Sequence, residues 1–263
     1  MTCSIARVSV LKVDFGRGER KLLKEEIAVE KLLFIYVNGQ HFVTLLASPN
    51  MKKELALGHL IAEGLIESLK QVRAVQVKGL RVDIMLTKNW GSTLKAAKIV
   101  VPIDTASGST KPDFLEVLEG IRKPLLASKT KFVAAKILSM VHKLNEEGKI
   151  HKKTCCTHSA AIFTFDGEMV SFAEDVGRHN AVDKVIGAAS LKTTDFARCV
   201  LLSSGRQSAY MVLKAVRARI PIVVSIAYPI ESGVRAAEKT GLTLIHASGK
   251  CIKVYTNTEK LVL

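Results

Sequence analysis

The sequence predicts an α/β protein, and three observations support this fold class. In the second half of the 263 residues, β-branched runs alternate with helical patterns. The first third instead contains short strand-like runs around one clear helix. Hydrophobic residues make up 48% and charged residues 24% of the chain, which is typical of a folded protein with its own core. We therefore expect a smaller strand-rich unit followed by an α/β layer with parallel strands.

The strand-rich unit is expected to contain a β-hairpin. Residues 32–37 form a β-prone run, Asn38-Gly39 is a strong turn signal, and residues 42–46 continue as the returning strand. Residues 72–86 again show alternating apolar positions, which predicts further strands.

One helix is predicted between these strands, over about residues 49–68. Ser48 offers an N-cap oxygen, and Pro49 suits the first turn of a helix. Leucines follow at mostly helical spacing, so one face of this helix should be buried.

A junction between two units is expected at residues 104–112, where small polar residues, glycine and proline predict an exposed loop. The predicted domains are therefore residues 1–112 and 113–263. A helix over about residues 131–148 should open the second domain, because its apolar residues lie on one stripe.

The second domain should alternate strands and helices. Strands at residues 160–165 and 169–172 flank an Asp166-Gly167 turn. The remaining predicted strands are 199–202, 220–226 and 242–246, and the remaining predicted helices are 181–190, 208–217 and 231–240.

Composition narrows the function classes. The formal charge of +15 predicts an anionic partner, although a lysine-rich solvated surface is the alternative explanation. Aromatic residues are only 5% and no nucleic-acid-binding signature is present, so we expect no nucleic acid partner. The apolar runs are too short to cross a bilayer, no leader peptide is evident, and the five cysteines are an odd number. These features predict a cytoplasmic protein without a membrane partner.

Two segments with the same Gly-Arg pattern are the strongest candidates for a ligand site. Residues 174–180 read Glu-Asp-Val-Gly-Arg-His-Asn, and residues 203–207 read Ser-Ser-Gly-Arg-Gln. Each lies between a predicted strand and a predicted helix, where glycine allows close approach and helix N–H groups attract anions. Arginine adds a planar fork suited to phosphate oxygens. Turns of this kind gather at the carboxyl ends of parallel strands, so the sequence predicts a pocket for a phosphorylated ligand.

A purely structural interpretation of the same residues remains open at this point. Gly177 and Gly205 would then serve tight turns, and Asn180 would cap a helix with Asp183 three residues later. For either turn alone this interpretation is the simpler one, whereas the pair on so basic a chain favours ligand binding. Histidines 158 and 179 could line the same pocket and contact phosphate or carry protons.

The segment Cys155-Cys156-Thr157-His158 invites comparison with a metal site. Adjacent cysteines rarely reach one ion together, and no second pair with suitable spacing exists, so no metal is predicted. A disulfide between the two is disfavoured as well, because neighbouring Cα atoms are only about 3.8 Å apart. Most free cysteines are simply small buried apolar groups.

The run Glu-Asp-Val-Gly-Arg-His-Asn-Ala-Val-Asp-Lys at residues 174–184 closely resembles the hallmark segment of the FdhD family of formate dehydrogenase accessory proteins. Ordered matches along nearly the whole chain support the resemblance. They are residues 35–39, 54–64, 157–161, 203–206 and 254–256.

The resemblance implies a cytidine-deaminase-like three-layer α/β/α domain preceded by a smaller strand-rich α+β domain, and a homodimer. It also implies a sulfur carrier that accepts sulfur from a cysteine desulfurase. The sulfur would pass to the molybdenum bis-guanine-dinucleotide cofactor of formate dehydrogenase. The zinc signature of deaminases is absent, so deamination is not implied. The residues expected to bind the cofactor are His158, Asp175, Gly177, Arg178, His179, Asn180, Ser203, Ser204, Gly205 and Arg206.

The chain departs from the family at the sulfur-carrying CxxC motif. The matching stretch is Ser-Gly-Ser-Thr, with Ser107 and Thr110 where the cysteines belong, and a hydroxyl cannot form a persulfide. Cys155 and Cys156, where the family usually has two glycines, are the candidate replacements. The alternative is a cofactor-binding chaperone without sulfur transfer. His246, Ser248 and Cys251 also replace a phenylalanine and two arginines that are common in the family.

Overall fold

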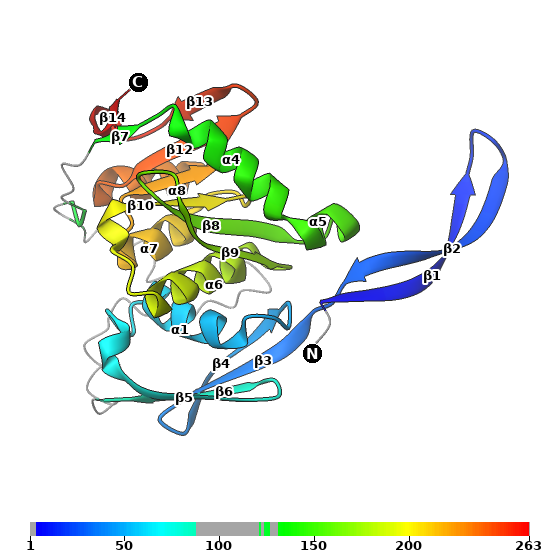
Figure 1. Ribbon diagram of the computed structural model, residues 1–263, viewed down its shortest axis with the longest axis horizontal. Coiled ribbons are helices and arrows are strands. Elements are labelled where there is room, and N and C mark those ends of the chain that lie inside the picture. Colours follow the sequence, from blue (N-terminus) through cyan, green and yellow to red (C-terminus); the bar gives the residue numbers. More distant parts are fainter. Residues whose placement is uncertain (1–3, 88–120, 122–123, 127–130, 263) are drawn as a thin grey trace.

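The computed structural model describes residues 4–87, 121, 124–126 and 131–262 and shows a mixed α/β protein (Figure 1). The predicted loop at residues 104–112 lies outside the described residues. The predicted domain boundary after residue 112 lies there too.

The chain begins with a two-stranded ribbon, which we call the arm. Strands β1 (Ile5–Asp14) and β2 (Glu19–Ala28) pair antiparallel with each other and form a sheet of their own. Figure 1 shows this arm extending away from the rest of the molecule.

A four-stranded sheet follows, which we call the small sheet. It contains β3 (Lys31–Val37), β4 (Gln40–Ala47), β5 (Val72–Lys78) and β6 (Arg81–Leu86) in the order β4-β3-β6-β5. Asn38 and Gly39 both have positive φ angles, 48° and 81°, as a tight hairpin turn requires. The predicted hairpin is therefore confirmed. A 3₁₀ turn, η1 (Leu69–Gln71), leads into β5.

The helix between β4 and β5 is shorter than predicted. Helix α1 spans Lys52–Ala62, and its N-cap residue is Met51, whose φ angle is 52°. Ser48 does not cap it. Its hydroxyl instead accepts a hydrogen bond from the N–H of Val176 at 3.1 Å, and its own N–H donates to Asp175 at 3.1 Å. A contact across 127 or more residues thus replaced the local cap that the sequence suggested.

The large sheet has six strands in the order β13-β12-β11-β10-β8-β9. Its strands are β8 (His158–Thr164), β9 (Met169–Asp175), β10 (Cys199–Ser203), β11 (Ile222–Ser225), β12 (Thr243–Ser248) and β13 (Cys251–Val254). The central β10, β11 and β12 are parallel, as predicted. The others pair antiparallel, so the sheet is mixed rather than parallel throughout. Short turns join β8 to β9 and β12 to β13, and so short a connection allows only antiparallel pairing.

Helices cover both faces of the large sheet (Figure 1). Helix α4 (Lys136–Glu147) packs on one face, while α6 (Arg178–Leu191), α7 (Ala209–Arg217) and α8 (Glu231–Thr240) pack on the other. The predicted helix over residues 131–148 instead starts with a short strand, β7 (Phe132–Val133), which pairs with β14 (Leu261–Val262). Among the described residues, no helix has both the length and the apolar character needed to span a bilayer. The remaining elements are α5 (Lys149–Thr154), η2 (Phe196–Arg198) and η3 (Thr258–Lys260).

The small and large sheets share one hydrophobic core. Buried side chains of the small sheet and α1, such as Ile35 and Leu60, belong to the same cluster as Val185 of α6 and Val212 of α7. Alternate residues of the large sheet face a second cluster under α4, which includes Met140. The core therefore joins α1 directly to the helices of the second half.

Helices α1 and α6 cross at two glycines. A methyl group on Gly58 would overlap the backbone carbonyl of Asp183, and one on Gly187 would overlap the carbonyl of Glu54. Neither position tolerates a side chain, so the two backbones touch.

Buried charges surround this crossing. Lys214 of α7 donates to Asp183 at 2.8 Å and to Glu63 at 2.8 Å, and His59 of α1 contacts Asp183 at 2.8 Å. Although burial opposes the charged form, Asp183 and Glu63 raise the pKa of Lys214. The pairing connects the end of α1 to both α6 and α7.

We expect Gly58→Ala to destabilise the protein by at least about 2 kcal/mol, because the added methyl must displace helix backbone rather than a mobile side chain. Urea denaturation followed by circular dichroism measures the change. Gly148→Ala is the matched control, since its nearest neighbour would lie 3.5 Å away, an ordinary contact. Equal denaturation midpoints for the two variants would contradict the proposed close crossing.

Candidate functional site

The two Gly-Arg segments lie at one edge of the large sheet. Strands β9 and β10 both pair antiparallel with β8, so they run in the same direction and end at the same edge. Strand β8 starts there, with His158 opposite Asp175 and Ala160 opposite Ser203. The sheet topology therefore brings His158 and both turns together, even though the sheet is not fully parallel.

The two turns are in direct contact. A Cβ atom on Gly205 would lie 2.7 Å from the Cβ of Arg178, so the side chain of Arg178 covers Gly205. Burial and the neighbouring Arg206 together lower the pKa of Arg178. Two guanidinium groups that repel each other in this way create a local excess of positive charge. Such an arrangement favours an anion between them.

Asp175 and Asn180 shape the first turn from inside. Asp175 accepts hydrogen bonds from the N–H of Gly177 at 2.8 Å and from the side-chain amide of Asn180 at 3.1 Å. Asn180 also donates to the carbonyl of Leu46 at 2.7 Å. Both side chains are buried. The suggestion that Asn180 caps the helix is wrong, because α6 begins at Arg178 with Gly177 as its N-cap.

Lys184 completes the support of this turn. Its ammonium group lies 2.6 Å from Asp175 and 2.7 Å from the side-chain oxygen of Asn50. Burial lowers the pKa of Lys184, and the contact with Asp175 opposes that effect.

The second turn is held by serines. Ser203 accepts a hydrogen bond from the N–H of Gly205 at 3.1 Å, and Ser225 donates to the carbonyl of Gly205 at 2.9 Å. Ser204 accepts from the N–H of Ser159 at 2.9 Å and lies 3.3 Å from Nδ1 of His158. Arg206 is exposed. The backbone is thus fixed, while the guanidinium of Arg206 stays available.

Burial favours the neutral form of both site histidines. Burial and the nearby Arg178 lower the pKa of His158. Burial, with Lys214 and Arg178, lowers the pKa of His179 to about 3. Nδ1 of His179 and Nε of Arg178 are buried and have no hydrogen-bond partner among the described residues. Buried polar atoms are normally paired, so these two atoms indicate a place where a polar ligand completes the site.

The cysteine pair lies close to this edge. Cys155 follows α5 in a left-handed conformation with φ 55°, and both Cys155 and Cys156 are exposed. Thr157 then anchors the chain by donating to Glu174 at 3.1 Å. Among the described residues, no group of three His, Cys, Asp or Glu side chains is arranged to hold a metal ion. Ser107 and Thr110 lie outside the described residues.

A cavity of about 280 Å³ separates α4 and α5 from the strand ends. Its walls include His151 and Thr157 on one side and Ser159 and Ser204 on the other. It therefore connects the segment next to the cysteines with the second Gly-Arg turn.

Sequence reasoning did not single out Tyr228. Its exposed ring stacks on His246, with ring centroids 3.9 Å apart and an angle of 19° between the planes. Lys253 lies over the same ring, 5.3 Å from its centroid. Because β11 and β12 are parallel to β10, Tyr228 and His246 belong to the same edge as the Gly-Arg turns. The only sequence signal was the position of Tyr228 just after a predicted strand.

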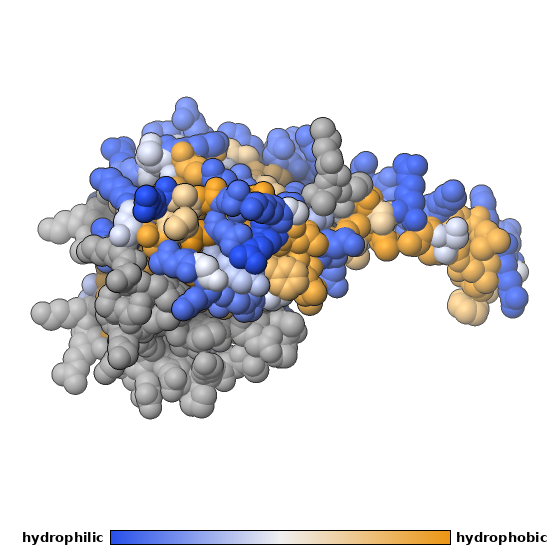
Figure 2. All heavy atoms as spheres, turned by 90° about the horizontal axis from the view of Figure 1, so that it is seen from below, coloured by the Kyte–Doolittle hydropathy of each residue, from blue (hydrophilic) through white to orange (hydrophobic). Residues whose placement is uncertain are grey.

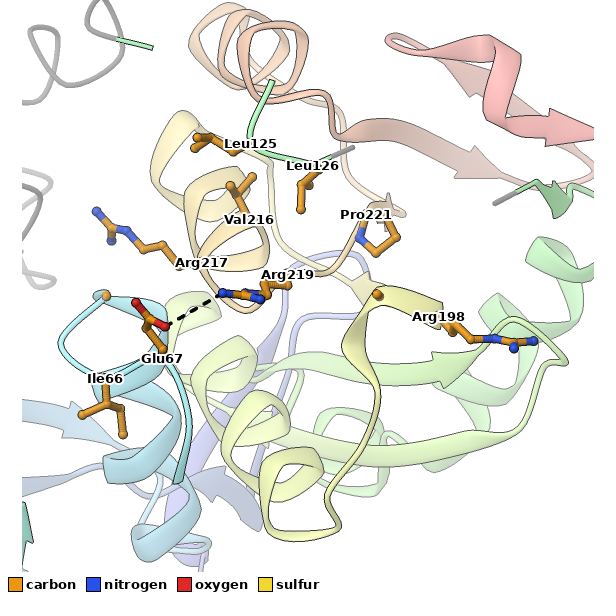
Figure 3. Close-up of a pocket in the computed structure, with 11 residues that line it drawn as sticks. Ile66, Glu67, Leu125, Leu126, Arg198, Val216, Arg217, Arg219 and Pro221 are labelled. Atoms are coloured by element: carbon orange, nitrogen blue, oxygen red, sulfur yellow. Dashed lines mark ion pairs between the residues drawn. The ribbon is translucent and has the colours of Figure 1, made fainter. Parts of the chain in front are cut away.

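A larger hollow, about 770 Å³, lies at the opposite edge of the sheet, where β10 and β11 begin (Figure 3). Its wall is largely apolar and includes Leu126, Val216 and Pro221, and Arg219 pairs with Glu67 across it at 3.9 Å. Figure 3 shows Arg198 pointing away from it. Among the described residues that line it, none is a predicted site residue, so its size alone does not make it the functional site.

The chain is similar to known proteins along nearly its whole length. Residues 28–262 match the FdhD/NarQ family. The sulfur carrier protein FdhD of Sulfolobus acidocaldarius is 34% identical over 262 residues, covering 98% of this chain and 99% of that protein. The sulfur carrier protein FdhD of Wolinella succinogenes is 30% identical, with 97% and 90% covered.

The fold also has a solved counterpart. The crystal structure of a protein named as a formate dehydrogenase accessory protein, from Desulfotalea psychrophila, superposes with a TM-score of 0.80. The two share 24% sequence identity, and the match covers 99% of this chain and 100% of that one. The comparison supports the arrangement of the sheets and helices.

The low pKa of His179 predicts a pH-dependent stability. The unfolded chain binds a proton at this residue below about pH 6.5, whereas the folded chain stays neutral down to about pH 3. The contribution of the neutral His179 to the free energy of unfolding is therefore complete above pH 6.5 and is lost as the pH falls toward 3. The loss between pH 6.5 and 4 is roughly 3 kcal/mol. Urea titrations of the wild type and His179→Gln at several pH values measure it.

The variant should lose stability less steeply than the wild type in this window. His142→Gln is the control and should follow the wild type, because the pair that His142 makes with Glu146 at 3.1 Å is exposed and contributes little to stability. Parallel curves for wild type and His179→Gln would show that His179 is not held neutral.

Proposed function

Because the chain belongs to the FdhD/NarQ family, we propose that it is the accessory protein that binds the bis-guanine-dinucleotide molybdenum cofactor at the joined Gly-Arg turns and carries sulfur to it for formate dehydrogenase. The observation that carries the proposal is the contact between Arg178 and Gly205, which makes one site from two distant segments.

The site has the chemistry that a diphosphate needs. Two turns before α6 and α7 place backbone N–H groups and the guanidinium groups of Arg178 and Arg206 at one edge. The unpartnered atoms of Arg178 and His179 fit additional phosphate or ribose oxygens. Within the proposed set, Asp175, Asn180 and Ser203 hold the turns, while His158, Ser204 and Arg206 face the ligand.

The exposed Tyr228 ring suits the guanine base. It lies at the same edge, and its stacking on His246 holds the ring in one orientation. A flat ring of this kind can stack on a purine and contributes about 1–3 kcal/mol in such contacts. This would compensate for the phenylalanine that His246 replaces.

Cys155 and Cys156 would carry the sulfur. An exposed thiolate attacks the terminal sulfur of a persulfide on the cysteine desulfurase. A new S–S bond forms on this chain as the donor's S–S bond breaks, and the donor leaves as a thiolate, with no net oxidation. The adjacent cysteine cannot readily displace that sulfur, because a disulfide between neighbours is strained.

We infer a cytoplasmic homodimer whose large sheet and flanking helices form the deaminase-like three-layer domain. Its partners are a cysteine desulfurase and a formate dehydrogenase. The alternative function, a cofactor chaperone without sulfur transfer, is favoured by Ser107 and Thr110 at the family's carrier positions.

Binding of GDP by isothermal titration calorimetry tests the cofactor site. Arg206→Ala should weaken GDP binding about 10- to 100-fold, because it removes charge-assisted hydrogen bonds to phosphate. Arg198→Ala is the matched control, since Arg198 lies at the opposite edge of the sheet and points away from the hollow there. Equal affinities for the two variants, or no binding by the wild type, would reject the site.

Sulfur loading distinguishes the two functions. After incubation with a cysteine desulfurase and cysteine, mass spectrometry should find one additional sulfur atom on the peptide containing Cys155 and Cys156. The double variant Cys155→Ser/Cys156→Ser should lose it, whereas Cys251→Ser, at another exposed cysteine, should keep it. A wild type that binds GDP but never acquires sulfur would establish the chaperone alternative.

A further inference from the structure

Within the part of the chain that the structure describes, the arm has no partner strand or helix along most of its length. Its strands pair only with each other among the described residues, and at its base Glu26 lies 3.8 Å from Lys153. A two-stranded ribbon by itself is at best marginally stable in water, because it buries little apolar surface. An arm of this length therefore needs a surface to pack against.

The outer half of the arm carries a cluster of exposed apolar side chains among charged residues such as Lys12, Arg20 and Lys24. The strand register places Leu11 opposite Leu22 on one face, with Val13 next to them. Phe15, at the tip, is 95% exposed and Leu22 is 74% exposed. Large apolar side chains gathered at an exposed tip are typical of an interaction surface rather than of solvated β-structure.

The outer face of the small sheet carries exposed apolar side chains as well, beside the Arg81–Asp83 ion pair. Leu32 of β3 lies opposite Leu46 of β4, Phe34 follows on the same face opposite Arg81, and Met85 lies on this face of β6 beyond Asp83. All four of these apolar side chains are exposed, while the residues between them point into the core. An uncovered sheet face of this kind normally packs against another layer.

The two surfaces face the same side of the molecule. Figure 2 views the molecule from the side of the small sheet and shows apolar side chains on the arm and on the body next to its base. In one copy they cannot meet, because the arm extends away from the body (Figure 1). A two-fold rotation, however, places the arm of each copy over the body of the other.

We propose that the arm of one copy packs across the outer face of the small sheet of a second copy, and that the second arm does the same in return. This assignment deepens the homodimer of the proposed function by giving its interface. Because one chain carries both surfaces, a second copy supplies a partner for each at once. A ten-residue ribbon is about 34 Å long and about 10 Å wide. One arm face together with one sheet face therefore approaches the roughly 800 Å² per partner that stable complexes bury.

Analytical ultracentrifugation of the full chain tests the interface. The wild type should be a dimer. Two variants should weaken the dimer and raise its dissociation constant about 100-fold each. They are the arm variant, Phe15→Ser/Leu22→Ser, and the sheet variant, Phe34→Ser/Met85→Ser. Leu191→Ser, at an exposed leucine on α6, is the control and should remain dimeric.

Mixing the two variants gives the sharpest test. A mixed dimer keeps one unaltered arm on one unaltered sheet, so dimers should reappear at concentrations where neither variant forms them alone. A monomeric wild type, dimers that survive either pair of substitutions, or a mixture that stays monomeric would each overturn the proposal. GDP binding is measured on the same samples. GDP binding by the variants confirms that they are folded. A wild type that does not bind GDP would count against the proposed function rather than against the interface.

Discussion

The close crossing of α1 and α6 is the constraint on which the rest of the structure depends. Gly58 and Gly187 let the two helix backbones touch, and the carbonyls of Asp183 and Glu54 occupy the space that side chains would need. The crossing joins the small sheet to the large one. It also fixes α6, whose first turn carries Arg178 and His179. The position of the anion site is thus set by packing about two helical turns away.

Buried charges extend this constraint from the crossing to the site. Lys214 pairs with both Asp183 and Glu63, Arg217 lies 3.5 Å from Glu63, and Lys184 pairs with Asp175, so cations balance the buried carboxylates that shape the interface. Arg178 and Arg206 lie together at the edge of the sheet, where burial and the charge of Arg206 lower the pKa of Arg178. A buried ion pair contributes little net stability, but removing one partner leaves an expensive isolated charge. This network therefore specifies one arrangement of α1, α6 and α7 and leaves the positive potential at the site.

Much of the fold could be read from the sequence, because local signals determined it. The Asn38-Gly39 hairpin, the helix from Glu231 and the parallel strands each follow from turn chemistry or periodicity. The sequence could not show that Ser48 does not cap α1, because its hydroxyl accepts a hydrogen bond from the N–H of Val176, far along the chain. The start of α6 at Arg178 was placed too late for a different reason, because the N–H of Gly177 donates to Asp175, two residues earlier, rather than to a cap at Asn180. The arm was not anticipated either, because six of the ten residues of β2 are charged and the strand shows no regular apolar alternation.

The candidate site shows the same division. The paired Gly-Arg segments identified the edge of the sheet, and the contact between Arg178 and Gly205 joins them. The sequence could not separate residues that support the turns, such as Asp175 and Asn180, from those that face a ligand, since both kinds are polar and lie next to each other. Tyr228 was missed because stacking on His246 depends on strand pairing that no local pattern reveals.

The most direct measurement is a crystal structure of the chain with GDP. It should show the diphosphate within hydrogen-bond distance of both Gly-Arg turns, between Arg178 and Arg206, with the guanine near Tyr228. GDP bound in the hollow beside Arg219, or held by one turn alone, would contradict the view that the two turns form a single anion site.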